Sequence, residues 1–250
     1  MSLSESVQTY VERQPSLAWR RSLMRGIIRF VGFKILWDVS VTGAENVPDG
    51  GPAILMMNHI SLLDPVLCMG AVMNRFVIPM SKIENLNNPL LNPFIRFWGA
   101  YTINRGEIDR RALVSSIELL KSGQLILIAP EGTRQKNGLT QPKEGMAYIA
   151  TKADAIIVPA AISGAIGWES NLKKLKRTRI NLNFGPPFRF KPPENTRAAR
   201  EALPAMMTEA MYRLALAVTD PQGRGVYADT SQAMAEYLEF LTPDEIHPPG

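Results

Sequence analysis

Short, continuous apolar runs recur along the chain, and segments with a helical pattern separate them. Runs of this length are typical of strands that are buried on both faces of a sheet. The predicted strands span residues 39–42, 53–57, 75–80, 101–104, 124–129, 156–162 and 180–184. Predicted helices at 109–121 and 144–153 lie between them. This alternation predicts an α/β fold with a mixed, largely parallel sheet flanked by helices.

The length of 250 residues suits one domain with small appendages. We expect the α/β domain to span residues 39–220. Its last helix, at 196–218, contains Pro204, and we expect a break or kink there because proline lacks a donor. Residues 221–250 are rich in glycine, proline and acidic side chains, which predicts a loosely attached tail. Cys68, the single cysteine, excludes an internal disulfide and has the apolar neighbours of a packed core thiol.

Residues 1–38 precede the predicted sheet, and residues 15–37 have the pattern of an amphipathic helix. Its cationic face consists of Arg21, Arg25 and Arg29. Its apolar face consists of Leu23, Ile27, Phe30 and Val31, with Trp19, Phe33 and Trp37 as interfacial aromatics. Two interpretations fit equally. The helix lies in a membrane surface with its arginines on anionic lipid, or it packs on the domain as an ordinary helix.

No apolar stretch approaches the ~18 residues that a spanning helix needs, and residues 1–14 lack the apolar core of a signal peptide. We therefore expect any membrane contact to be peripheral or monotopic, on the cytoplasmic face. The net charge of +5 is compatible with anionic lipid, phosphorylated small molecules or nucleic acid as partners.

Asn58, His59 and Asp64 directly follow the apolar run at 53–57. The carboxyl end of a strand is where α/β folds place ligand sites. Asp64 precedes Pro65, which predicts a helix N-cap, and the short connection can return its carboxylate to His59. A histidine oriented by a buried aspartate can act as general base on an alcohol, because its pKa lies near neutral pH. A capping aspartate beside a structural histidine fits the same residues.

A second polar group follows other apolar runs. Glu131-Gly132-Thr133-Arg134 comes after one predicted strand, Arg105 comes after another, and Lys143 lies at a predicted helix start. A guanidinium group matches the geometry of phosphate oxygens. Each cation by itself is typical of a solvated surface, but their placement at several strand ends predicts a phosphate-bearing substrate.

Other classes of site are not indicated. One histidine and one cysteine fall short of a zinc ligand set, and His247 lies near the C-terminus, where we do not expect order. No nucleotide-binding glycine loop and no Gly-x-Ser-x-Gly segment is present. The basic run at 173–177 fits a solvated loop better than a nucleic-acid site. An anionic membrane or the phosphates of coenzyme A would also explain it. We expect neither metal nor nucleic acid as a partner.

Four segments resemble, in order and spacing, the signature motifs of the glycerolipid acyltransferases. These segments are Asn58-His59-x4-Asp64 for their NHxxxxD motif, residues 99–105 for the second, Glu131-Gly132-Thr133-Arg134 for the EGTR motif, and Val158-Pro159-Ala160 for the fourth. Lys82-Ile83-Glu84 and Lys143-Glu144-Gly145 fit positions between them. The resemblance covers residues 40–190 and is greatest to the 1-acylglycerol-3-phosphate acyltransferases.

That resemblance implies an acyl thioester as donor, either acyl-CoA or acyl-carrier protein, lysophosphatidate as acceptor, and no cofactor. It implies His59 as general base and Asp64 as its partner. The residues implied to handle the acceptor phosphate are Arg105, Glu131, Gly132, Thr133 and Arg134. The residues implied to support the site are Asn58, Lys82, Lys143 and Pro159. Gln135 stands where many members have serine, which leaves the acceptor less determined.

The same residues also fit alternative functions. The acceptor is another lysophospholipid or glycerol 3-phosphate in one alternative. In another, the protein is a non-catalytic lipid-binding or membrane-remodelling member. The intact pair of His59 and Asp64 favours an enzyme, because a pure binder has no need of a base.

Overall fold

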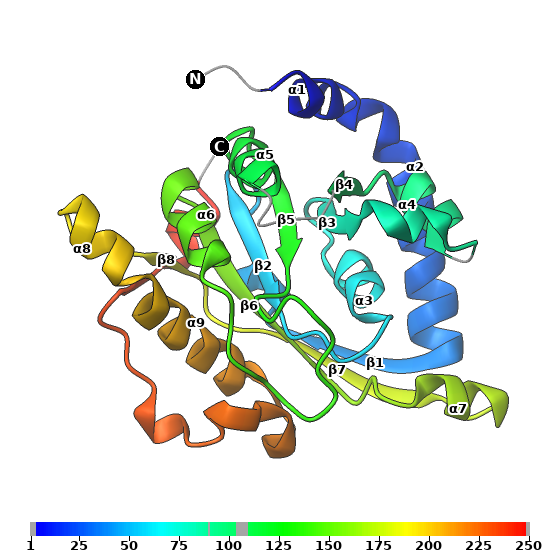
Figure 1. Cartoon of the computed structure of the whole chain (residues 1–250). Helices are drawn as coiled ribbons and strands as arrows, with labels where there is room; N and C mark the ends of the chain where they lie inside the picture. The colour runs from blue at the N-terminus through cyan, green and yellow to red at the C-terminus, as the bar shows by residue number, and fades with distance from the viewer. Residues whose placement is uncertain (1–3, 90, 104–109, 249–250) are drawn as a thin grey trace.

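The computed structural model describes residues 4–89, 91–103 and 110–248. Within these residues, nine strands form one sheet in the order β1-β7-β6-β2-β5-β3-β4, with β8 paired to β6 and β9 to β8 (Figure 1). The strands are β1 Trp37–Thr42, β2 Ala53–Met57, β3 Val77–Lys82, β4 Tyr101–Ile103, β5 Leu125–Ile128, β6 Ile156–Ser163, β7 Thr178–Phe184, β8 Phe188–Phe190 and β9 Leu238–Phe240.

Most neighbouring strands run parallel. β2 is parallel to β5 and β6, and β3 is parallel to β4 and β5. β7 is antiparallel to β6, and β1 is parallel to β7, so these two strands run the opposite way. The mixed, largely parallel sheet that the sequence predicts is confirmed. The carboxyl ends of β2, β5 and β6 consequently meet at one edge.

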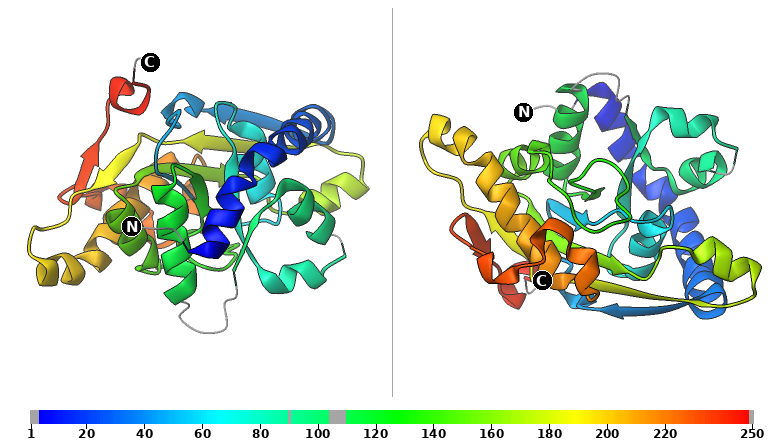
Figure 2. Two further views of the ribbon diagram at one scale, coloured as in Figure 1. Left: turned by 90° about the horizontal axis from the view of Figure 1, so that it is seen from above. Right: turned by 60° about the horizontal axis from the view of Figure 1, so that its bottom comes forward.

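Helices cover both faces of the sheet (Figures 1 and 2). They are α1 Glu5–Glu12, α2 Gln14–Ile27, α3 Asp64–Ala71, α4 Leu91–Trp98, α5 Arg110–Lys121, α6 Gly145–Ala153, α7 Trp168–Lys173, α8 Thr196–Glu201, α9 Leu203–Ala217 and α10 Pro243–Ile246. A π-helix, η1 Ile28–Leu36, continues α2, and the 3-10 helices are η2 Ala44–Asn46, η3 Ile83–Asn87, η4 Pro221–Tyr227 and η5 Thr230–Gln232. The break expected at Pro204 lies between α8 and α9.

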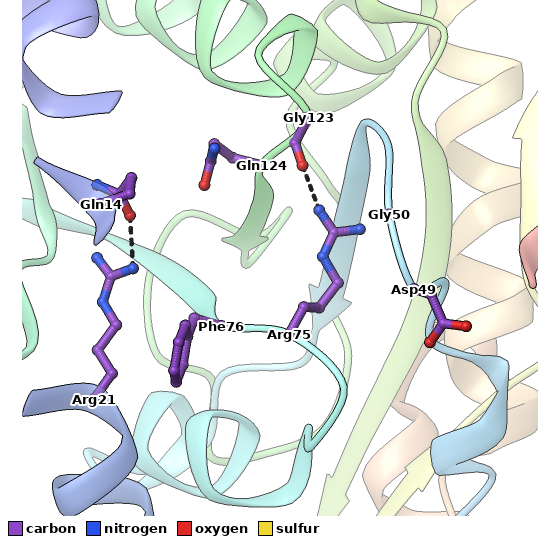
Figure 3. A pocket seen from close by; sticks show the side chains of 8 residues that line it. All are labelled: Gln14, Arg21, Asp49, Gly50, Arg75, Phe76, Gly123 and Gln124. Carbon is purple, nitrogen blue, oxygen red and sulfur yellow. Dashed lines mark hydrogen bonds between the residues drawn. The ribbon is translucent and has the colours of Figure 1, made fainter. Parts of the chain in front are cut away.

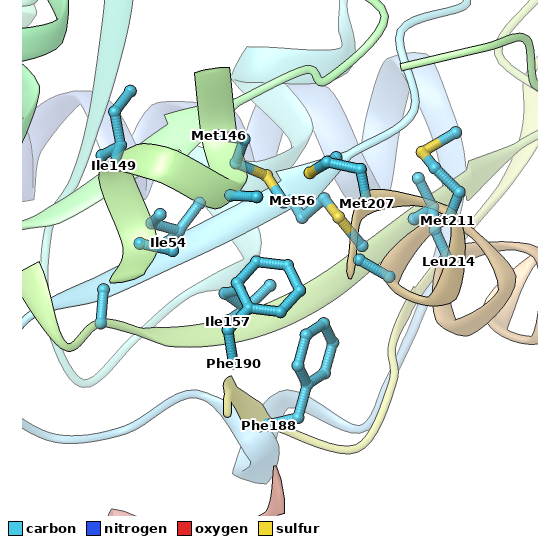
Figure 4. Close-up of a cluster of buried hydrophobic side chains, with 14 of the residues drawn as sticks. Ile54, Met56, Met146, Ile149, Ile157, Phe188, Phe190, Met207, Met211 and Leu214 are labelled. Carbon is cyan, nitrogen blue, oxygen red and sulfur yellow. The ribbon is translucent and has the colours of Figure 1, made fainter. Parts of the chain in front are cut away.

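Each face of the sheet has its own hydrophobic core, because the central strands are buried on both sides. In β2, Ile54 and Met56 pack with α5, α6 and α9, whereas Leu55 and Met57 pack with α3 and η1. Figure 4 shows the first of these cores, where side chains of α6 and α9 meet those of β2. Cys68 is fully buried in the second core, as its apolar neighbours predict.

The N-terminal amphipathic segment is helical, but its arginine face is turned toward the protein. Arg21 is 2% exposed and donates to the carbonyl oxygens of Trp98 and Gly99, at 2.8 and 3.1 Å. Arg25 donates to the carbonyl of Val72 at 3.2 Å. The prediction of a lipid contact is therefore wrong for Arg21, whereas Arg25 is half-buried and Arg29 is exposed.

The physical reason is that α3 and α4 end beneath α2. The last carbonyl groups of a helix have no partner within the helix, and arginine side chains satisfy them well. Arg29 likewise donates to the carbonyl of Gly70, in the last turn of α3. Large apolar side chains of this segment stay in solvent, and those more than half exposed are Trp19, Leu23, Ile27, Phe30 and Ile35. Among the described residues no helix is long and apolar enough to cross a membrane.

Residues 221–248 do not form the loosely attached tail that their composition predicts. Tyr227, Leu238 and Ile246 are buried, and β9 pairs with β8 in the sheet. His247 has a defined place as well, because its Nδ1 lies 2.8 Å from an Asp49 carboxylate oxygen. Turn-forming residues dominate the composition of this segment, but a few of its apolar side chains are buried and attach it to the rest of the domain.

Candidate active site

Asn58 ties the carboxyl end of β2 to β6. The residue is 2% exposed, its Nδ2 donates to the Ile162 carbonyl at 2.8 Å, and its Oδ1 accepts from the Ile162 amide at 2.7 Å. This reciprocal pair extends the contact between the strands beyond the last residue of β2. Asn58 therefore fixes the backbone from which the next residue, His59, projects.

His59 and Asp64 come together as the sequence predicts. Nδ1 of His59 lies 2.9 Å from Oδ2 of Asp64. A carboxylate accepts, so Nδ1 carries the proton and donates, which leaves Nε2 as the free acceptor of the neutral ring. The His59 side chain is 22% exposed and Asp64 is fully buried. The ring thus has one nitrogen fixed inside the protein and an accessible edge for a substrate.

Asp64 lies in the first turn of α3 and is not its N-cap, which is Leu63. The N-cap role predicted for Asp64 is wrong, because its carboxylate turns back to the loop before the helix. Oδ2 accepts from the amides of Ile60 and Ser61, both at 2.7 Å. Burial raises the pKa of Asp64, and the donors from His59, Ser61 and Ile60 oppose that rise. The helix N-terminus also favours the charged form.

Glu131 binds the loop after β5 to the histidine backbone. The residue is 6% exposed, and Oε1 accepts from the Thr140 amide at 2.9 Å, while Oε2 accepts from the His59 amide at 3.4 Å. The Gln135 amide in turn donates to the His59 carbonyl at 2.6 Å. Desolvation raises the pKa of Glu131, and these hydrogen bonds oppose it. The carboxylate points into the protein, so Glu131 positions the loop and does not offer itself to a phosphate.

The next residues of the loop present cations and polar groups at the surface. Gly132 has a φ of 74°, and a β-carbon there would lie 3.1 to 3.2 Å from the end of the Lys143 side chain. Glycine therefore allows Lys143 to lie close against the loop. Thr133 and Arg134 are exposed. Arg134 and Lys143 bring two cations to the loop that Glu131 ties to His59.

The sequence also singles out Arg105, Lys82 and Pro159. Arg105 lies outside the described residues. Lys82 is the last residue of β3, whose end lies beside β4. Pro159 lies within β6, where it pairs with Met56 and its carbonyl accepts from the Gly185 amide at 2.8 Å. It supports the sheet and lies away from the carboxyl end of the strand.

The C-terminal segment also holds the active-site loop, and no sequence motif indicates this contact. The Val226 amide donates to the Leu139 carbonyl at 3.0 Å, and the Leu139 amide donates to the Gly223 carbonyl at 3.1 Å. Gly138 and Gly225 allow the two backbones to approach, since a β-carbon on Gly138 would lie 2.7 Å from the Gly225 nitrogen. Such a contact between distant backbones leaves no periodic signal in a sequence.

Cavities of about 260 and 240 Å³ lie away from His59. The larger lies near the amino ends of the strands, and Figure 3 shows Arg21 and Arg75 on its walls, hydrogen-bonded to Gln14 and to the Gly123 carbonyl. These arginines satisfy internal carbonyls, which is a structural role. Among the described residues no group of three or more His, Cys, Asp or Glu side chains could hold a metal ion.

A histidine oriented by a buried aspartate lies at the carboxyl edge of an α/β sheet, with cations on the adjoining loop, and this arrangement is chemically able to serve as a general base. The sequence model of the Acyltransferase family matches residues 38–163 of this chain, and the chain belongs to that family. The resemblance found in the motifs is confirmed.

Relatives with the name 1-acyl-sn-glycerol-3-phosphate acyltransferase also match this chain. The protein from Borreliella burgdorferi is 33% identical over 147 residues, which are 56% of this chain and 57% of the relative. The protein from Streptococcus pneumoniae is 29% identical over 167 residues, which are 66% of this chain and 61% of the relative. The match thus spans about three-fifths of these relatives. The crystal structure of the 1-acyl-sn-glycerophosphate acyltransferase from Thermotoga maritima shares the fold, with a TM-score of 0.59, 24% identity, and coverage of 79% of this chain and 80% of the other.

Proposed function

We propose that this protein transfers a fatty acyl group from acyl-CoA or acyl-carrier protein to the free hydroxyl of 1-acylglycerol-3-phosphate, which gives phosphatidate. The observation that carries the proposal is the 2.9 Å contact between His59 Nδ1 and Asp64, with Nε2 left to act as a base. The names of the Borreliella burgdorferi and Streptococcus pneumoniae relatives support this acceptor.

In the proposed reaction, Nε2 of His59 takes the proton of the acceptor hydroxyl while the oxygen attacks the thioester carbonyl carbon. A C–O bond forms, and the adduct collapses as the C–S bond breaks. The imidazolium then returns its proton to the leaving thiolate, so His59 ends as it began. The buried carboxylate of Asp64 stabilises the imidazolium between these two steps.

Arg134 and Lys143 bind the acceptor phosphate in this proposal, with the hydroxyl of Thr133 as a further donor. A charge-assisted hydrogen bond of this kind contributes about 1.5–3 kcal/mol. Arg105 joins them as an expectation from the sequence. Glu131 contributes indirectly, because it fixes the loop relative to His59.

The acyl chains of substrate and product are insoluble, so we propose that the protein works at the cytoplasmic surface of a membrane as a peripheral or monotopic protein. The exposed apolar face of α2 and η1 supports this proposal. Trp19 and Phe30 are 61% and 64% exposed, and Leu23 and Ile35 are also more than half exposed. Burial of such side chains in lipid contributes ~25 cal/mol per Å².

The test is mass spectrometry of the products after the purified chain is offered a panel of acceptors with acyl-CoA and with acyl-carrier protein. Formation of phosphatidate from lysophosphatidate, lost in His59→Ala, is the expected result. Acylation of a different lysophospholipid or of glycerol 3-phosphate would reassign the acceptor. Binding of lipid without any product would favour a non-catalytic lipid-binding protein.

A further inference from the structure

The C-terminus of α7 carries a leucine where helices usually place a glycine. The Lys176 amide donates to the Asn171 carbonyl at 2.9 Å. The Leu175 amide donates to the Leu172 carbonyl at 3.0 Å. This pair of bonds is a Schellman motif, whose left-handed residue is here Leu175, with a φ of 53°. A leucine is disfavoured in this conformation because its β-carbon crowds the backbone.

Leu175 is 94% exposed, so its side chain makes no packing contact in the free protein that would offset the disfavoured backbone conformation. The free protein thus combines a disfavoured backbone with an apolar side chain in water. Transfer of the leucine side chain out of water on binding to a partner would offset both the disfavoured backbone conformation and the exposure of apolar surface.

Lysines surround this apolar tip. Lys173, Lys174 and Lys176 are exposed, and within the described part of the chain they form no ion pair. Arg177, by contrast, lies 3.6 Å from an Asp38 carboxylate oxygen, so part of its charge is compensated. The nearest acidic residue of α7 itself is Glu169, in its first turn. The tip is therefore cationic around one apolar side chain.

The structure also fixes this tip beside the N-terminal segment. Nη2 of Arg177 donates to the Trp37 carbonyl at 2.8 Å, and the rings of Trp37 and Trp168 meet edge to face at 5.9 Å. Figures 1 and 2 show α7 next to the end of the blue N-terminal helical segment. The last turns of that segment expose Phe30 and Ile35.

We propose that Leu175 and the three lysines around it form a second contact with an anionic lipid surface, separate from the apolar face of α2 and η1. Leu175 enters the headgroup region, and the lysines lie among the lipid phosphates. Phosphates of coenzyme A or of a nucleic acid would engage the lysines but would leave the leucine in water. A lipid surface accounts for both. The inference rests on the membrane location proposed above.

The test is sedimentation of the full chain with phosphatidylcholine vesicles and with vesicles that also contain phosphatidylglycerol. Leu175→Gly should weaken binding to both by at least about threefold, with an unchanged or higher melting temperature, because glycine suits a positive φ. The triple change of Lys173, Lys174 and Lys176 to Gln should weaken binding to anionic vesicles on the order of a hundredfold, because each charge contributes roughly fivefold. It should leave binding to neutral vesicles unchanged.

A charge-matched control changes three exposed lysines elsewhere, namely Lys121, Lys152 and Lys191, to Gln. The control should bind anionic vesicles within about threefold of the parent chain. Equal losses in the control and in the α7 variant would overturn the proposal, as would unchanged vesicle binding by Leu175→Gly. A raised KM for acyl-CoA with unchanged vesicle binding would assign the lysines to coenzyme A and overturn it as well.

The variants are also assayed for turnover with acceptor dispersed in detergent, where we expect the parent rate. Failure of the parent chain to acylate any acceptor would refute the proposed function, whereas the vesicle measurements would still decide the role of Leu175. The two proposals can therefore fail separately.

Discussion

Gly225 and Leu139 are in direct backbone contact: a β-carbon on Gly225 would lie 2.1 Å from the Leu139 carbonyl oxygen. Leu139 belongs to the loop that starts at Glu131, and Gly225 belongs to a segment beyond the residues that the Acyltransferase family model matches. The contact connects the active-site loop to the C-terminal part of the chain. It gives residues 221–227 a role in positioning that loop.

Gly225→Ala should therefore affect substrate handling as well as stability. Its φ of 53° and ψ of −127° suit glycine, and the new methyl group would meet backbone that cannot rotate away. We expect a loss of about 1–3 kcal/mol in the free energy of unfolding and a higher acceptor KM. Gly50→Ala is the matched control, because nothing lies within 4 Å of its added carbon. Denaturant unfolding and steady-state kinetics check this, and an unchanged acceptor KM in Gly225→Ala would remove the positioning role.

His59→Ala should lower turnover by at least ~10² with the fold intact, because the acceptor hydroxyl loses its base. Asp64→Asn should also slow the reaction, since the imidazolium loses its buried anion. The asparagine must in addition bury an amide near Oδ1, which has no hydrogen-bond partner among the described residues. Circular dichroism confirms folding, and single-turnover rates report the chemical step. A folded His59→Ala protein with near-normal turnover would refute the mechanism.

Substitutions of Glu131 and of Arg134 should have different effects, although both residues belong to one motif. Glu131→Ala removes the carboxylate that accepts hydrogen bonds from the Thr140 and His59 amides, so kcat and thermal stability should both fall. Arg134→Ala removes an exposed cation, so stability should hold while the acceptor KM rises about tenfold or more. The donor KM serves as the internal control. Equal changes in both KM values would remove Arg134 from the phosphate site.

The sequence predicted those features that have a local signal. Continuous apolar runs located the central strands, because a strand buried on both faces must be apolar throughout, as β2 is. The three-residue strands β8 and β9 were not predicted, because so short a segment has no such run. The short connection from His59 to Asp64 predicted their contact, since so short a segment permits few other geometries. Pro204 predicted the break before α9, because proline cannot continue a helix.

Features that depend on distant partners escaped prediction. The row from Arg21 to Arg29 has the pattern of a lipid-facing cationic stripe, but the ends of α3 and α4 present it with unpaired carbonyls that no local pattern reveals. The inward direction of Glu131 depends on Thr140, further along the same loop, and on the His59 amide after β2. The contact of Gly225 with Leu139 joins segments far apart in the chain.

His247 should attach the C-terminal segment in a pH-dependent way. Nε2 faces the Glu45 carbonyl at 2.7 Å and Nδ1 faces Asp49, so both nitrogens must donate and the charged ring fits best. The Glu45 carbonyl, followed by Asp49, raises the pKa of His247. A raised folded pKa contributes stability that is present below the unfolded value of ~6.5 and lost as pH rises through the folded value. NMR titration should show a midpoint above that of free histidine, and Asp49→Asn should lower it. An unshifted midpoint would contradict the attachment.

The two faces of the N-terminal helix should have different roles: the arginine face should stabilise the fold, and the apolar face should bind the membrane. Arg21 satisfies buried carbonyls, so Arg21→Gln should lower the free energy of unfolding by about 1–3 kcal/mol, whereas the exposed Arg13→Gln should not. Leu23 and Phe30 are exposed, so their joint change to Ser should leave stability nearly unchanged and weaken vesicle binding. That loss should persist at high salt, because salt screens charges and leaves apolar burial intact. Chemical denaturation and vesicle sedimentation at low and high salt measure the two effects. If Arg21→Gln weakened vesicle binding in a salt-dependent manner without loss of stability, the arginine face would contact lipid after all.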